Sequence, residues 1–171
     1  MIDTSLDHEY RLRAVHLLES VVPADRSSDS AGLVCQGRQL ARGYSGCADL
    51  AHYMYEALGL KSRQINRAPA WRCGQNVSLL AGWSVARRPE PELLGVDGGD
   101  VLIRWSQIDT RDAHVVCVLA HCGDTLSTAE YGQTPPQIGR LCARRVSGEG
   151  RPWRLWLPLP AVLRACSQSG Y

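Results

Sequence analysis

Apolar side chains recur with helical spacing between residues 47 and 58. Counting from Cys47, they follow after three, four, seven and eleven positions, at Leu50, Ala51, Met54 and Leu58. This spacing collects them on one face of an amphipathic helix. Gly59 comes next, and glycine is the residue that most often ends a helix. The pattern therefore predicts a helix that begins near Cys47 and ends at Gly59.

Several later segments have the composition of β-strands. Residues 101–105 follow a Gly-Gly-Asp turn, and residues 114–120 are almost wholly apolar, which is typical of a strand buried on both faces. Strands are also predicted at residues 125–131 and 154–157. A helix is expected within the first 22 residues, and a loop with a short helix over residues 68–82. These elements predict an α+β domain with helices packed on an antiparallel sheet.

Length and composition favour a single domain over residues 1–171. No linker, repeat or low-complexity stretch divides the chain, which is long enough to bury a full core. The net charge is only +2, and no nucleic-acid-binding motif accompanies the arginines, so we expect no nucleic-acid partner. The first residues lack the basic start and apolar run of a secretion signal, and no segment has the length of a membrane span.

The seven cysteines do not form the paired spacing of a structural zinc site. His114, Cys117, His121 and Cys122 are close in sequence. However, alternation along a strand sends His114 and Cys117 to opposite faces, which argues against a shared metal ion. We expect neither a metal nor an organic cofactor.

The start of the helix at Cys47 is a suitable place for a nucleophile. If Ser45 caps this helix, Cys47 lies in its first turn, where free backbone N–H groups and the helix dipole stabilise a thiolate. Burial in the core is the competing interpretation, because free cysteines are usually buried. His114 opens the strand at 114–120 and supplies a base. Cysteine and histidine are the minimum set of a cysteine hydrolase, since the imidazole accepts the thiol proton and returns it to the leaving amine.

A third group is needed to orient the imidazole, and the next hairpin suggests Glu130. A three-residue loop ending at Gly123 would place His114 opposite Glu130. A two-residue turn, Gly123-Asp124, would instead place Cys117 opposite Glu130. The first hairpin is favoured, because Glu130 is the only acid of the strand that follows.

Other residues are candidates for supporting roles. Asp112 is the alternative orienter of the histidine. Gln36 and Gln39 precede the cysteine and could donate a side-chain amide to an oxyanion. Tyr44 and Ser45 are further candidates for substrate contact, because they directly precede the helix.

The order of these motifs resembles the NlpC/P60 and CHAP families of papain-like peptidases. Ser45-Gly46-Cys47 opens an amphipathic helix, Gly99-Asp100 leads into a strand, and His114-Val115-Val116 opens the next one, within residues 44–133. The resemblance implies a papain-like fold with Cys47 as nucleophile, His114 as base and Glu130 as the third residue. It also implies cleavage of amide bonds, usually in the stem peptides of bacterial cell walls. The family commonly carries an aspartate where this chain has Ser45.

The expected activity is that of a cysteine amidase or endopeptidase acting on peptidoglycan. The absence of a secretion signal predicts a protein made in the cytoplasm and delivered by a specialised system or by lysis, as an interbacterial effector or a phage lytic enzyme. An immunity or inhibitor protein would then be a partner. Other interpretations stay open: a transglutaminase-like acyltransferase or deamidase, a protein-directed cysteine protease, and an inactive binding domain that keeps the fold.

Overall fold

The computed structural model describes residues 4–21, 34–35, 38–39, 47–60, 95–104, 114–131, 139–146 and 153–168. The helices are α1 (Thr4–Val21), α2 (Cys47–Ala57) and α5 (Leu159–Gln168). Five strands form an antiparallel sheet: β3 (Val101–Arg104), β4 (His114–Cys122), β5 (Thr125–Tyr131), β6 (Gly139–Arg145) and β7 (Trp153–Leu157). Their spatial order is β6-β5-β4-β3-β7, and β1 (Val34–Cys35) pairs separately with β2 (Arg38–Gln39). The predicted α+β class is confirmed.

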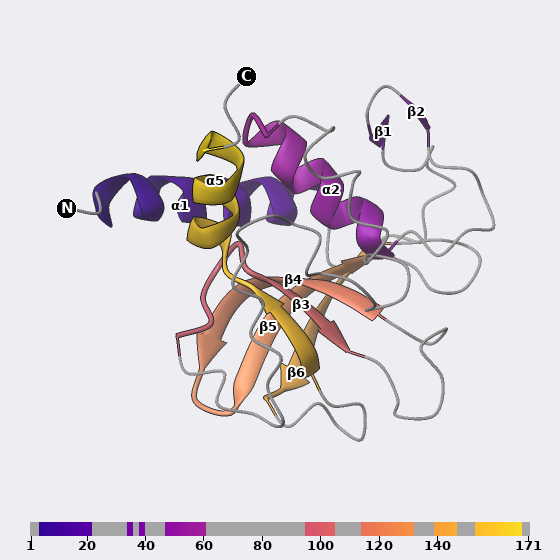
Figure 1. Cartoon of the computed structure of the whole chain (residues 1–171). Coiled ribbons are helices and arrows are strands. Elements are labelled where there is room, and N and C mark those ends of the chain that lie inside the picture. Colours follow the sequence, from indigo (N-terminus) through magenta and orange to yellow (C-terminus); the bar gives the residue numbers. More distant parts are fainter. Residues whose placement is uncertain are drawn as a thin grey trace.

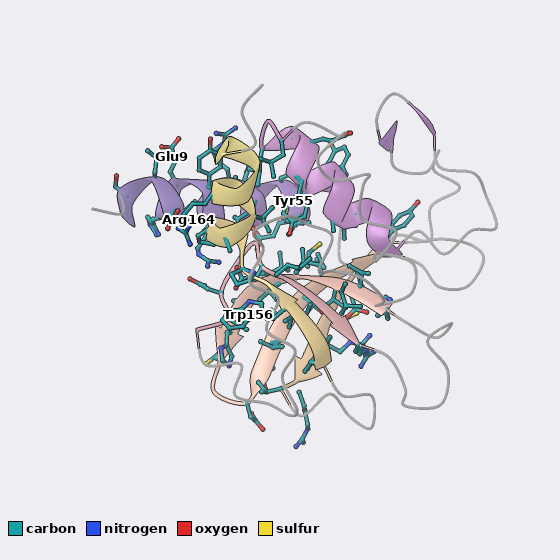
Figure 2. The ribbon with its side chains drawn as sticks, in the orientation of Figure 1. Glu9, Tyr55, Trp156 and Arg164 are labelled. Carbon is teal, nitrogen blue, oxygen red and sulfur yellow. The ribbon has the colours of Figure 1, made fainter. Side chains whose placement is uncertain are left out.

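One face of the sheet is covered by the three helices (Figure 1). The larger hydrophobic core lies between these helices and the sheet. Tyr55, labelled in Figure 2, is buried in this core on the inner side of α2. Its members include Leu18 of α1, Leu50, Met54 and Tyr55 of α2, Val162 of α5, and Val115, Cys117 and Ala129 of the sheet. In β5, and in residues 114–119 of β4, the odd-numbered residues therefore face the helices. No helix of the described ranges is long and apolar enough to cross a bilayer.

The opposite face of the sheet carries a second core. Its members are Val96, Leu102, Val116, Val118, Leu126 and Trp153. The indole Nε1 of Trp153 on β7 donates to the carbonyl oxygen of Arg145 on β6, at 3.3 Å. Because β6 and β7 are the two edge strands, this bond requires the sheet to curl. The second core therefore lies inside the curl, away from the helices.

The predicted helix at residues 47–58 agrees closely with α2. Its apolar stripe is buried at each position whose side chain is described, from Leu50 to Leu58. The amide of Gly59 donates to the carbonyl of Glu56, and that of Leu60 donates to Tyr55. These two bonds form a Schellman motif, which ends the helix where the glycine predicted it.

The predicted strands are also present, with shifted ends. The strand predicted at 125–131 matches β5, and the strand at 114–120 extends to Cys122. The sequence pattern did not predict β6 or α5. In the N-terminal helix, Leu12 is 59% exposed, while Ala14 and Leu18 form the buried side. The predictions for Trp105 and for residues 68–82 lie outside the described residues.

The predicted three-residue hairpin loop is wrong. Cys122 pairs with Thr125, so the turn consists of Gly123 and Asp124 alone. Gly123 has a φ of 61°, and a positive φ at the first central residue is what two-residue hairpin turns require. The connection is therefore the shorter of the two that the sequence left open.

A β-bulge between Val118 and Ala120 then shifts the register of this hairpin. On the side of the bulge away from the turn, Cys117 pairs with Ala129 and Val118 pairs with Thr128. Without the bulge, the two-residue turn would place Cys117 opposite Glu130. The extra residue in β4 prevents this pairing and places the even-numbered residues from His114 to Val118 on the face that carries Glu130.

The turn before β3 joins the sheet to two helices through Asp100. This carboxylate is fully buried. It accepts hydrogen bonds from Nη1 of Arg11 on α1 (2.7 Å), from the amide of Leu159 at the start of α5 (2.8 Å) and from Nε1 of Trp156 (2.9 Å). Trp156 lies on β7 near α5 (Figure 2). Burial is the largest effect and holds the pKa of Asp100 above its ordinary 3.8. The Arg11 charge and these hydrogen bonds act in the opposite direction. Since every partner is a donor, we take the group to be ionised at neutral pH.

Gly99 allows this close packing of α1 and α5 on the turn. Its φ is 84°, and a Cβ atom added there would lie 2.7 Å from Cδ2 of Leu159 and 3.0 Å from Cβ of Ala14. Glycine therefore avoids both backbone strain and a clash at this position. The Gly99-Asp100 pair of the sequence motif thus has a structural role.

Replacing Asp100 should strongly destabilise the fold. Asp100→Ala leaves the Arg11 guanidinium and the amide of Leu159 without this acceptor, and we expect a loss of about 3–5 kcal/mol in the free energy of unfolding. Urea denaturation followed by circular dichroism measures it. Asp97→Asn is the matched control, because the Asp97 side chain is 66% exposed and lies 3.9 Å from the same arginine. An Asp100→Ala variant as stable as Asp97→Asn would contradict this role.

Candidate active site

His114 and Glu130, two residues predicted to act together, form a hydrogen bond in the structure. Nε2 of His114 lies 2.6 Å from Oε2 of Glu130. His114 is the first residue of β4 and is 3% exposed, and Glu130 is the second-last residue of β5 and is 5% exposed. The structure therefore brings the proposed base and its proposed orienter into direct, buried contact.

The β-bulge explains how this contact arises. Val118 pairs with Thr128, and residues two apart on a strand share a face, so His114 and Glu130 both lie on the face of this pair. They are not direct partners but are offset along the strands. A diagonal offset of two residues is within reach of long side chains. The contact was predicted, but the register on which that prediction rested is wrong.

Glu130 is held by three side chains. Arg144 on β6 donates from Nε to Oε1 and from Nη2 to Oε2, each at 2.7 Å, and the hydroxyl of Thr128 donates to Oε1 at 2.8 Å. Burial by itself raises the pKa of Glu130. The hydrogen bonds from Arg144, His114 and Thr128 and the charge of His114 outweigh burial, and the pKa falls well below its ordinary 4.5. Glu130 is therefore an anion throughout the physiological pH range.

A further cation lies next to the histidine. Arg104, the last residue of β3, is the register partner of His114 in the sheet, and it is buried. Its guanidinium carbon lies 5.4 Å from the centre of the Trp153 ring, a distance at which a cation interacts with the aromatic face. The imidazole thus has a cationic neighbour on β3 and an anionic one on β5.

Cys47 is the first residue of α2, as predicted. This helix packs against β4 and β5 on the helix-covered face, whereas His114 lies on the curled face. The two residues begin their respective elements. In Figure 1, the end of α2 that carries Cys47 lies toward the end of the sheet at which β5 ends. The start of α2 and the start of β4 therefore lie toward the same end of the sheet.

The remaining predicted residues fall mostly outside the described ranges. Gln36, Tyr44, Ser45 and Asp112 lie outside them, and Gln39 is the last residue of β2. Cys117 is buried in the helix-side core, on the face opposite His114, as strand alternation predicted. Within the described part of the chain, no three histidine, cysteine or acidic side chains are grouped as metal ligands. His121 instead contacts the backbone oxygens of Val96 and Gly123.

Arg144 and Thr128 also belong to this group, and neither was predicted from the sequence. Residues 139–145 include three arginines, and this basic composition obscures the alternation of β6. Thr128 lies two residues before Glu130 in a correctly predicted strand. Its position on the same face was a usable signal.

No protein-family model matches the chain, and neither a curated protein nor a solved structure matches it.

Proposed function

We propose that the protein is a cysteine hydrolase of papain-like type that cleaves amide bonds in peptidoglycan stem peptides. The observation that carries the proposal is the 2.6 Å contact between His114 and Glu130 at the start of β4. A histidine bonded to a buried carboxylate is the arrangement that orients a general base. The position of Cys47 at the first residue of α2 supplies the matching nucleophile.

In the proposed reaction, the Cys47 thiolate attacks the carbonyl carbon of the scissile amide. The thiol proton passes to His114 and then to the departing amine, so a thioester and a free amine result. Free N–H groups at the start of α2 would stabilise the tetrahedral oxyanion. Water then attacks the thioester with His114 as base, which releases a carboxylic acid and regenerates the thiol. Glu130 stays ionised and stabilises the imidazolium that forms in each half of the cycle.

The end of the sheet is the place where such a site would be assembled. β4 starts there with His114, β5 ends there just after Glu130, and β3 ends there with Arg104. A carbonyl bound at this end would be accessible to groups from both faces. This placement allows a nucleophile on the helix-covered side to act together with a base on the curled side.

Acylation by an activated ester of a stem peptide tests the proposal. We expect a mass increase on the Cys47-containing tryptic peptide, which decays as water hydrolyses the thioester. Exposed Cys122 serves as the internal control for non-specific acylation. Transfer of the acyl group to an added amine in preference to water would favour the acyltransferase. No labelling of Cys47 above that of Cys122 would reject an enzymatic nucleophile and favour the binding domain.

A further inference from the structure

The pairing of Arg144 with Glu130, close to His114, is a contact that the proposed mechanism does not use. We propose that Arg144 is a positioning residue that fixes the Glu130 carboxylate toward His114 and limits the pH range in which His114 holds a proton. The inference deepens the proposed function and rests on it for its catalytic meaning. In this proposal Arg144 acts on the base through the Glu130 carboxylate.

The geometry of the pair shows why Arg144 orients the carboxylate. Its Nε and Nη2 atoms each donate to a different oxygen of Glu130, at 2.7 Å. Two parallel bonds fix the plane of a carboxylate, which one bond cannot do. Thr128 shares one oxygen with Arg144, and His114 shares the other. The carboxylate is thus held in one orientation, with Oε2 facing the imidazole.

The position of Arg144 on β6 makes this contact unlike a chance surface ion pair. Arg144 pairs in register with Leu126, whereas Arg140 is the register partner of Glu130. The Arg144 side chain must therefore extend along the strand face to reach a carboxylate four positions away. It is only 25% exposed along this path, and the Glu130 side chain is 7% exposed. Lysine has a single ammonium group and cannot reproduce the paired bonds.

The charges around His114 give this arrangement an electrostatic consequence. Among the described residues of the strands that flank the imidazole, Arg104 on β3 is cationic, Glu130 on β5 is anionic, and Arg144 on β6 is cationic. Arg140 occupies a register position on β6 opposite Glu130. Arg144 offsets much of the Glu130 charge and shares Oε2 with the imidazole. Without Arg144, Glu130 would stabilise the protonated imidazole more strongly.

Titration of His114 by NMR tests this inference on the full chain, with ¹³C-labelled histidine and assignment by a His114→Gln variant. We expect Arg144→Gln to raise the pH midpoint of the His114 ring signal by about one unit, because an opposing charge is removed from a buried group. Arg144→Lys should raise it less. Arg145→Gln is the matched control, since Arg145 is the next residue along β6 and is exposed. It should leave the midpoint unchanged.

The same variants separate positioning from a purely structural role. Arg144→Gln should shift the acid limb of the pH profile of kcat/KM upward and lower kcat about tenfold or more, with little change in KM. An unshifted or lowered His114 midpoint in Arg144→Gln would overturn the proposal. If Arg144→Gln does not fold, unchanged titration and turnover in Arg144→Lys would overturn it. The NMR titration requires no turnover, so a protein that cleaves no amide would refute the proposed function and leave this test intact.

Discussion

Cys47→Ala is expected to abolish hydrolysis of peptidoglycan stem peptides while the protein stays folded. Removal of a catalytic nucleophile typically costs about 10⁴–10⁶-fold in kcat, because no other group can form the covalent intermediate. Cys47 is the first residue of α2, and Leu50, Met54 and Leu58 anchor this helix in the core, so we expect the variant to fold. The measurement is the mass-spectrometric rate of product release, with circular dichroism as the check on folding.

Two other cysteines provide controls for this variant. Cys122 is exposed at the end of β4, and Cys122→Ala should retain full turnover. Cys117 is buried in the helix-side core, so Cys117→Ala should lower stability modestly while activity persists. A Cys47→Ala protein that keeps turnover within a few-fold of the wild type would remove this residue from the mechanism. Loss of activity in Cys122→Ala would point to a different nucleophile.

The elements that the sequence predicted best are those determined by local patterns. The helix from Cys47 to Gly59 combines a regular apolar stripe with a glycine stop, and both act within a few turns of chain. β5 is bounded by the turn at Gly123-Asp124, and its predicted limits match the structure. In each case, local preference and tertiary packing favour the same conformation.

The hairpin register could not be predicted, because a bulge is a tertiary feature. Nothing in the residues around Leu119 distinguishes the extra residue from its neighbours in an apolar strand. The loop prediction was too long by one residue, and the bulge shifted the pairing by another. Each of these two differences alone would move His114 to the face opposite Glu130. Together they cancel, so His114 and Glu130 still share a face. The contact therefore agrees with the prediction although the pairing does not.

The two missed elements carried weaker signals. β6 contains three arginines, which mask the alternation of a strand that supplies Arg144 to a buried carboxylate. At α5, Pro160 in the first turn was a usable sign of a helix start. The hydrogen bond from the amide of Leu159 to Asp100 links residues far apart in sequence, so no local pattern could reveal it.

Replacing Glu130 should impair both turnover and stability. Glu130→Gln keeps the shape of the side chain but loses the charge that stabilises the imidazolium, and we expect a loss of about 10²-fold or more in kcat. Glu130→Ala should be more severe, because it removes this acceptor from both His114 and the Arg144 guanidinium. Breaking a buried ion pair in this way costs about 3–5 kcal/mol in the free energy of unfolding.

The pH dependence of stability distinguishes the Glu130 charge from simple packing. The folded-state pKa of Glu130 lies well below its ordinary 4.5, so its charge stabilises the fold above that pH and ceases to do so as the pH falls toward the folded-state pKa. Urea unfolding at pH 7 and pH 3 should therefore show a stability gap between wild type and Glu130→Gln that narrows at low pH. Asp124→Asn, in the exposed hairpin turn, should show no such gap. A stability gap of the same size at both pH values would mean that the Glu130 charge contributes nothing to the stability of the fold. An active Glu130→Ala alongside an inactive Asp112→Asn would reassign the orienting role to Asp112.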